Sequence, residues 1–491
     1  MVAVFRQVTA NCWWLAFTYA FVLFNPAAFD DQIGTRLYRN SIFAPAYFLA
    51  FGLMLFVLLR LLKGNPTRRW LVTINILLGL VFTFSYYLNE AGMWLVPCLV
   101  VSHLVCLIVY IRRSHPFLGG CGADRSNWLA YFNNLPRLRV VASCLIFAIP
   151  FGIFGSITLA YREVNQTFFG VRVIETRTQG ELGIFAENVY QIYSDNRTDT
   201  VWAPPDAVDA AFAASATLRS IPNLQAELDA QYVPILGDFL PWRLRWGLTN
   251  TGNWTSEPEL QLLFAQVNAE LADAFRSGQL GRDARFQLVS SAGGRNLAEI
   301  ERLIAPTLNT YRVFLTLTDF APGGQPSAPD SNRDLAFISD LTNFPLTPSN
   351  TTDPETGFQS GELRALNWHI GNSAVNTIFA LYRIVYPTLM TFACLGIIGA
   401  FIPIKHTFDG RQLSRVGIAL TAIVLMGISA LYAFGIAWFA EFLWVHGDPA
   451  SQNVIQKYYA TGMVPLLALF ILLGSYLFFD FIRRLRIPRA T

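Results

Sequence analysis

VGIALTAIVLMGISALYAFGIAWFA, residues 416–440, contains no aspartate, glutamate, lysine or arginine. At about 1.5 Å of rise per residue, a helix of this length crosses a hydrocarbon core of about 30 Å. Of the whole chain, 53% is hydrophobic and only 14% is charged, whereas an ordinary soluble domain is about 25% charged. The chain therefore needs lipid as part of its solvent.

Seven further segments have a similar length and few or no charges, so the sequence predicts eight transmembrane helices. The other seven lie at residues 8–28, 41–60, 70–89, 93–111, 140–160, 384–404 and 459–480. A signal peptide is the alternative for the first, because Arg6 precedes its apolar run, but no small-residue cleavage site follows. We expect an all-α integral membrane protein with five helices before a long polar segment and three after it.

The basic residues predict the orientation of these helices. Seventeen lysines and arginines lie in residues 1–7, 60–69, 112–139, 405–415 and 481–491. The alternate connectors hold only 3. Because basic residues in short loops stay on the cytoplasmic side, we expect cytoplasmic termini and an extracytoplasmic segment over residues 162–383. Only 3 of the 36 basic residues are lysines, a bias typical of a GC-rich genome. A bacterial inner membrane is therefore the first expectation, and a eukaryotic ER or plasma membrane the alternative.

The predicted spans divide the chain into three domains. Residues 1–161 would form a membrane bundle of five spans, and residues 384–491 a bundle of three spans with a basic cytoplasmic tail. Residues 162–383 are long enough for one independent extracytoplasmic domain. This segment has 16 basic and 25 acidic residues, a net charge of −9, which argues against binding of nucleic acid. It contains no cysteine, which excludes a disulfide framework.

Helical patterns dominate the predicted outer domain. Apolar residues at helical spacing lie between Ser256, a potential N-cap, and Gly278, a potential stop. A second helix is expected over residues 204–220, where a proline pair stands at its start.

Three other stretches of this domain have distinct patterns. Residues 296–320 predict a further helix, with a kink at Pro306. Residues 168–185, FFGVRVIETRTQGELGIF, resemble a strand. Residues 321–361 are rich in Pro, Gly, Ser, Asn and Asp, which indicates a flexible loop.

Ionisable side chains are nearly absent from the predicted spans. His103 is the single clear case, and we expect a hydrogen-bonded packing residue rather than a proton carrier. Transport is therefore the third functional hypothesis.

Two sets of small residues, Ala148–Gly152–Ser156 and Gly396–Gly399, predict helix packing within one bundle, with a homo-oligomer as the alternative.

Asp30 and Asp31 lie in FNPAAFDDQIGTRLYRN, residues 24–40, between the first two predicted spans. The simplest interpretation is the polar boundary of a span. An alternative is an acidic rim that Asp30 and Asp31 form with Glu90 on the outer face, where it would hold a divalent cation or supply a general base. The pair resembles the acidic residue or pair in the first outer loop of polytopic transferases that use lipid-linked sugars. That resemblance covers these two residues and implies transfer chemistry at the outer face.

Other sites of chemistry are not evident in the sequence. No H-E-x-x-H, G-x-S-x-G or C-x-x-C motif occurs, and apart from the divalent cation no cofactor is expected. Trp242 and Trp246, in PWRLRWGL, and His369, in LNWHIGN, are candidates for binding a lipid or a partner. Packing into the domain core is the simpler interpretation of the two tryptophans, and an amphipathic helix on the outer leaflet is the alternative.

The absence of transport charges and catalytic motifs favours a non-enzymatic role. The first hypothesis is a multi-pass membrane protein whose periplasmic domain binds a partner protein or a lipid-linked intermediate in envelope biogenesis. The second is a membrane-embedded transferase with Asp30, Asp31 and Glu90 as its acidic centre. The third is a transporter or channel. The expected partners are the bilayer and a membrane or extracytoplasmic protein.

Overall fold

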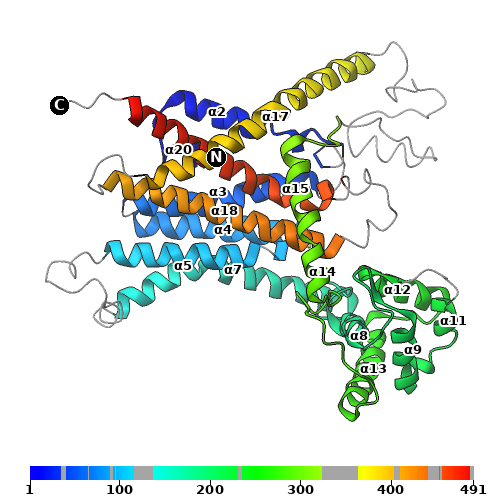
Figure 1. Cartoon of the computed structure of the whole chain (residues 1–491). Helices are drawn as coiled ribbons and strands as arrows, with labels where there is room; N and C mark the ends of the chain where they lie inside the picture. Colours follow the sequence, from blue (N-terminus) through cyan, green and yellow to red (C-terminus); the bar gives the residue numbers. More distant parts are fainter. Residues whose placement is uncertain are drawn as a thin grey trace. The chain divides into compact units, whose positions relative to one another are not determined.

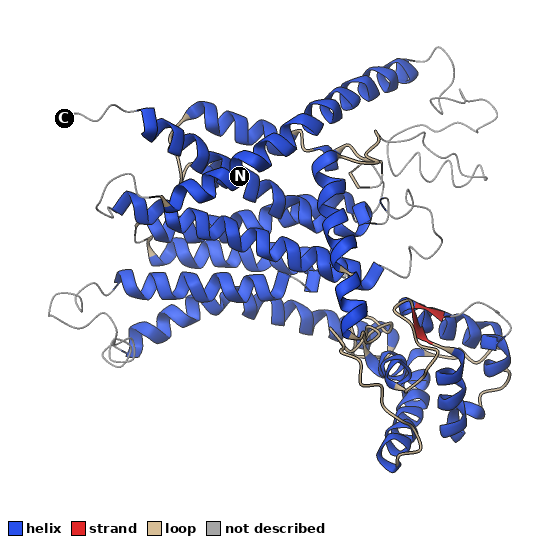
Figure 2. Ribbon diagram, viewed as in Figure 1, coloured by secondary structure: helices blue, strands red, loops and turns tan. Residues whose placement is uncertain are grey.

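The computed structural model describes residues 1–31, 33–34, 40–64, 66–88, 92–93, 95–114, 137–229, 235–322, 363–402, 410–440, 453 and 456–486. Helices dominate this part of the chain, and one two-stranded ribbon interrupts them (Figure 2). Seven helices among the described residues are long and apolar enough to cross a membrane: Ser41–Lys63, Arg68–Leu88, Leu95–Arg113, Val140–Phe169, Ile370–Phe401, Ser414–Ala440 and Gln456–Leu485. The chain is therefore a multi-pass α-helical membrane protein.

The first predicted span differs from the other seven. Its helix, α2, covers Cys12–Leu23 and has 12 residues, which corresponds to about 18 Å. The side chain of Asn11 caps its N-terminus by accepting from the N–H of Trp13, 2.9 Å away. A short 3-10 helix, η1 (Pro26–Ala28), follows it. Helix α2 is shorter than a hydrocarbon core of about 30 Å, so an eighth transmembrane helix stays a prediction.

Two compact units make up the chain. Unit 1 comprises Met1–Phe147, Thr310–Tyr432 and Lys457–Thr491, and unit 2 comprises Ala148–Asn309 and Ala433–Gln456. The boundaries between them fall within long helices. The domain limits expected at residues 161 and 383 stay predictions, and the flexible loop expected at 321–361 lies almost wholly outside the described residues.

Unit 1 is built from long apolar helices (Figure 1). Its elements are α1 (Val2–Phe5), α2, η1, α3 (Asn40–Lys63), α4 (Arg68–Leu88), α5 (Leu95–Ser114), α17 (Leu363–Phe401), η7 (Ala460–Gly462) and α20 (Met463–Arg486). It also contains parts of α7 (Arg137–Phe169), α15 (Ile304–Thr316) and α18 (Gly410–Ala440). Helix α20 is the most enclosed, because it packs against both α17 and α3 and most of its apolar surface is buried.

Glycines bring α17 and α20 into direct backbone contact. A Cβ added at Gly396 would lie 2.1 Å from the carbonyl oxygen of Gly474, so neither position tolerates a side chain. The predicted packing role of Gly396 is therefore confirmed. For Gly152 on α7 the packing role stays a prediction, because a Cβ there would meet no atom within 4 Å.

His103 on α5 is held by hydrogen bonds inside the bundle. Its Nε2 lies 2.9 Å from Oδ1 of Asn75 on α4, and its Nδ1 lies 3.1 Å from the carbonyl oxygen of Leu99. Asn75 also donates to the carbonyl of Leu71, 2.8 Å away. The expected role of His103 in hydrogen-bonded packing is confirmed.

Unit 2 is a helical domain with its own apolar core. Its remaining elements are α8 (Gly180–Gln191), β1 (Val201–Ala203), α9 (Pro205–Ala214), α10 (Ala216–Arg219), α11 (Leu224–Asp229), β2 (Ile235–Leu236), η4 (Gly237–Phe239), α12 (Leu240–Asn250), α13 (Glu257–Ser277) and α14 (Leu297–Arg302). Strands β1 and β2 are antiparallel, with Val201 opposite Leu236. The core brings together Phe185, Trp202, Phe264 and, from the end of α18, Trp438.

Local signals predicted part of unit 2. Helix α13 begins after Ser256, whose side chain accepts from the N–H of Glu259, and ends at Gly278 with a φ of +78°, as expected. The kink expected at Pro306 is wrong. The break lies earlier, at Leu303, and Pro306 occupies the first turn of α15, where a missing N–H costs nothing.

The strand expected over residues 168–185 is also wrong. Helix α7 continues to Phe169, residues 171–179 are irregular, and α8 starts at Gly180. Alternating apolar residues make a strand only when a neighbouring strand pairs with them, and within the described residues none does so here.

Candidate functional site

Asp30 and Asp31 belong to a buried ionic cluster in unit 1. Asp30 is 0% exposed, and its Oδ2 lies 2.8 Å from Nζ of Lys457, which is 1% exposed. The same ammonium lies 3.4 Å from Oδ1 of Asp31 and 2.6 Å from the carbonyl oxygen of Asp319. The ring of Phe320 is 5.1 Å from Nζ. These five residues form what we call the Lys457 cluster.

The turn after η1 positions Asp30. Asn25 caps η1 by accepting from the N–H of Ala27 at 3.1 Å, and it donates to Oη of Tyr386 at 2.8 Å. Beyond Asp30 the chain turns sharply, and the N–H of Gly34 donates to the Asp30 carbonyl at 3.0 Å. A Cβ at Gly34 would lie 2.2 Å from a carbonyl oxygen of the preceding turn, so only glycine fits there.

The segment after α15 provides the other side of the cluster. The N–H of Asp31 donates to the carbonyl of Ala321 at 3.0 Å, and the N–H of Ala321 donates to Oδ2 of Asp30 at 3.3 Å. Leu317 and Asp319 have φ values of +51° and +58°, in the left-handed region that side chains disfavour. The hydrogen bond from Lys457 to the Asp319 carbonyl stabilises this strained turn.

The acceptors around Lys457 match its donors. An ammonium group has three hydrogens, and two carboxylates and one carbonyl lie within reach of them. Buried charges persist when they are paired and hydrogen-bonded in this way. A general base or a metal ligand needs a carboxylate that a substrate or an ion can contact. Of the two carboxylates that pair with Lys457, only that of Asp31, with 29% of its side chain exposed, meets that condition. The arrangement suits a structural clasp better than a reactive centre.

The simplest interpretation of Asp30, the polar boundary of a span, stays a prediction, and the structure adds that its carboxylate is buried. The ion pair with Lys457 replaces water as the partner of the carboxylate. Glu90, the third member of the expected acidic rim, lies outside the described residues. Among the residues that the structure covers, no three His, Cys, Asp or Glu side chains are grouped as metal ligands. The rim and its divalent cation stay a prediction.

Lys457 was not among the residues expected to function. It is one of only three lysines in the chain, and it is the single basic residue of the connector 441–458. A lone lysine on the side from which basic residues are depleted was the available signal.

Helix α12 of unit 2 exposes two tryptophans. Trp242 is 39% exposed and Trp246 is 51% exposed, and Phe239 just before the helix is also exposed. The opposite side of the helix, with Leu244 and Leu248, is fully buried in the domain core. The expectation that both tryptophans pack into the core is therefore wrong, because the leucines take that side.

Two arginines accompany this aromatic face. Arg245 is exposed and its guanidinium lies 5.4 Å from the ring of Trp254, while Arg243 is half-buried. Residues 239–250 contain no acidic side chain. Partial burial lowers the pKa of Arg243 from its ordinary value, and the group stays charged at neutral pH. His369, the third expected binding residue, belongs to α17, and its side chain lies outside the described set.

A shallow groove lies beyond the C-terminal end of α12. It has a volume of about 310 Å³, and its lining includes Ile221, Pro222, Asn253, Glu259 and Leu263. Pockets for small ligands begin at about 300 Å³. The groove therefore has room for one headgroup or one side chain of a larger partner.

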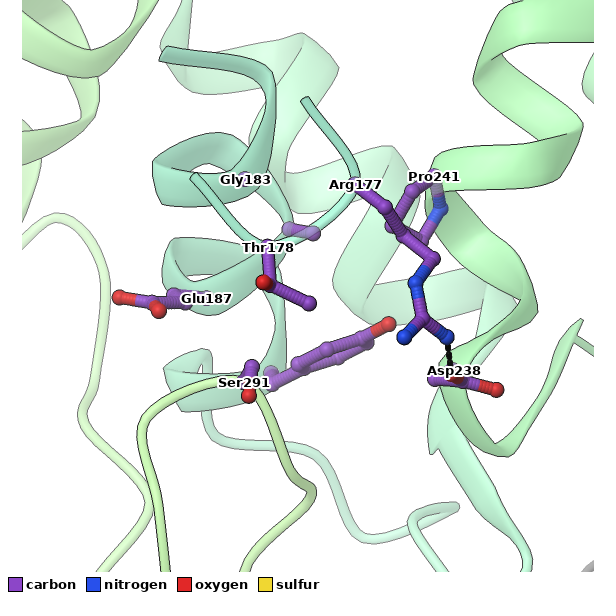
Figure 3. Close-up of a pocket in the computed structure, with 9 residues that line it drawn as sticks. Arg177, Thr178, Gly183, Glu187, Asp238, Pro241 and Ser291 are labelled. Atoms are coloured by element: carbon purple, nitrogen blue, oxygen red, sulfur yellow. Dashed lines mark hydrogen bonds and ion pairs between the residues drawn. The ribbon is translucent and has the colours of Figure 1, made fainter. Parts of the chain in front are cut away.

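A much smaller cavity lies beside α8 (Figure 3). Its volume is about 10 Å³, and an ion pair between Arg177 and Asp238 borders it. Tyr190 also lines it, and among the described residues its buried hydroxyl has no hydrogen-bond partner. A space of this size admits about one water molecule, so it is not a substrate pocket.

Comparison with known proteins gives no relative from which a role could be transferred. No family model matches the chain, and neither a curated protein nor a solved structure is significantly similar to it.

Proposed function

We propose that this protein is a non-enzymatic component of a bacterial inner membrane whose outer domain binds a partner protein or a lipid-linked intermediate during envelope assembly. In this proposal both termini are cytoplasmic, and residues 162–383 lie outside the membrane. The observation that carries it is the exposed aromatic face of α12, formed by Trp242 and Trp246.

The energetics of tryptophan support a binding role for this face. A tryptophan can cover about 150–250 Å² of surface, and each buried Å² of apolar area contributes about 25 cal/mol. Tryptophan and arginine are also the side chains that dominate binding energy at interfaces. Leu244 and Leu248 fix the helix to the core, so the exposed face is presented without further ordering of the backbone.

A transferase acting on a lipid-linked substrate is the second candidate function. The observation in its favour is Asp31, whose carboxylate is partly exposed beside the ammonium of Lys457. Against it stand the complete burial of Asp30 and the three acceptors that already surround Lys457. Asp31→Asn distinguishes the two functions, because a transferase loses activity and a binding protein does not.

A complementation assay tests the binding proposal. In a strain whose envelope integrity depends on this protein, Trp242→Ala combined with Trp246→Ala should abolish complementation at a normal protein level in the membrane. Leu262→Ala on α13 is the matched control, because Leu262 is 74% exposed in the same unit and should be dispensable. Full complementation by the double variant would refute the proposal.

A reporter fused to the C-terminus tests the proposed orientation. It should give a cytoplasmic signal, and a periplasmic signal would overturn the orientation.

A further inference from the structure

We propose that the aromatic face of α12 docks on the surface of the phospholipid bilayer, with its tryptophans in the interfacial layer and Arg243 and Arg245 on lipid phosphates. This inference rests on the proposed function, since it specifies the partner of the same face. Of the two kinds of partner proposed above, it commits to the lipid side: the face meets the lipid surface, where a lipid-linked intermediate would lie, rather than a second protein.

The arrangement of side chains around α12 fits a helix lying in the plane of an interface. At about 100° per residue, Phe239, Trp242 and Trp246 fall on one side of the helix, and the buried leucines fall about 180° away. Arg243 and Arg245 project to the two flanks of the aromatic side. An apolar aromatic strip between two cationic flanks is typical of helices that bind membrane interfaces.

Charge distinguishes α12 from the rest of its domain. Residues 162–383 carry a net charge of −9, whereas residues 239–250 hold two arginines and no acid. An acidic domain is repelled by anionic headgroups, so a local basic segment selects the side that approaches them. Indole rings favour the boundary between headgroups and hydrocarbon, because their body is apolar and their N–H needs a polar partner.

Helix α12 belongs to a unit that is covalently attached to a membrane-spanning helix. Unit 2 includes Ala148–Phe169, the second part of a helix that is long and apolar enough to cross the membrane. Docking is therefore an intramolecular event, for which the effective concentration of lipid surface is high. Contacts that would be weak for a free protein suffice in this geometry.

Photo-crosslinking of the full-length protein in lipid nanodiscs tests the inference. A benzoylphenylalanine replaces Thr249, which is exposed on the aromatic side of α12 and leaves both tryptophans intact, or Leu262 on α13 as the control. With phosphatidylcholine and phosphatidylglycerol as the lipids, mass spectrometry should find about fivefold more phospholipid adduct at position 249 than at 262. Equal lipid adducts at the two positions would overturn the docking.

The charge of the lipid tests the role of the arginines. Arg243→Gln combined with Arg245→Gln should lower the adduct at position 249 by about threefold in phosphatidylglycerol-containing discs and leave it unchanged in pure phosphatidylcholine. An unchanged adduct in both would refute phosphate contacts. In native membranes, a protein adduct at position 249 in place of a lipid adduct would overturn bilayer docking and leave the proposed binding function standing. Full complementation by the variant with Trp242→Ala and Trp246→Ala, together with a lipid adduct at position 249, would refute the proposed function and leave bilayer docking standing.

Discussion

Lys457 in unit 1 and Tyr190 in unit 2 are buried to the same degree, with 1% and 2% of their surfaces exposed, yet their surroundings are opposite. The ammonium of Lys457 faces three oxygen acceptors, whereas the hydroxyl of Tyr190 has no hydrogen-bond partner among the described residues. Burial alone therefore does not tell whether a polar group stabilises the fold. Whether a buried polar group raises or lowers the free energy of unfolding depends on its hydrogen-bond partners.

The difference follows from the cost of burying each group. A buried charge without a partner costs several kcal/mol, so a site that holds a lysine must supply acceptors. A buried hydroxyl costs about 1–3 kcal/mol, which a large apolar ring can offset. Burial, with a contribution from Asp238, raises the pKa of Tyr190 well above its ordinary value, so the hydroxyl stays protonated. Polar contacts stabilise the buried ammonium of Lys457, whereas the apolar ring of Tyr190 offsets the cost of its buried hydroxyl.

Removing the positive charge of the Lys457 cluster should have the largest effect. Lys457→Met leaves the carboxylate of Asp30 buried without its counter-ion, and we expect the free energy of unfolding to fall by about 3–5 kcal/mol. Thermal unfolding of the purified protein in detergent measures the loss. Adding Asp30→Asn to Lys457→Met removes the unpaired charge and should recover about half of that loss. A single variant as stable as the native protein would show that the ion pair contributes nothing.

Removing the hydroxyl of Tyr190 should act in the opposite direction. Tyr190→Phe keeps the ring and eliminates a buried group that lacks a partner, so we expect the free energy of unfolding to rise by about 1 kcal/mol. Tyr193→Phe is the control, because Tyr193 is exposed and should change stability little when its hydroxyl is lost. A lower melting temperature for Tyr190→Phe would mean that the hydroxyl is hydrogen-bonded in solution, which would remove the contrast with Lys457.

The smallest effect should come from Asp31. Its contact with Lys457 is longer, at 3.4 Å, and its carboxylate is partly in water, so Asp31→Asn should cost less than about 1 kcal/mol. Complementation by this variant should be complete. Loss of complementation with normal stability would instead assign Asp31 a chemical role and favour the transferase.

Signals that act over a few residues were readable from the sequence. Helix α13 follows from its cap and its stop, because both depend on neighbouring backbone atoms. The break before α15 was misplaced at Pro306, because proline is also compatible with the first turn of a helix. The exposure of Trp242 depends on which side of α12 the domain core covers, and spacing within the helix leaves that side undefined.

The ionic cluster lay beyond the reach of the sequence. Asp30 and Lys457 are 427 positions apart, and no pattern near either residue indicates the other. The acidic pair was named as a candidate site from the sequence, but its partner was not. Pairing of this kind depends on the tertiary arrangement of the helical residues 456–459, which precede η7, and the turn after η1, and composition and periodicity do not specify that arrangement.

The span between Asp30 and Lys457 also has a consequence for how the protein is made. At about 5–20 residues per second, a ribosome needs between about 20 and 90 s to reach the lysine after it has made the aspartate. During that interval the carboxylate has no counter-ion from Lys457, and it must remain in contact with water or carry a proton. Closure of the cluster is therefore a late event of biogenesis, and a chain truncated before residue 457 would present an uncompensated acid to the quality-control machinery of the membrane.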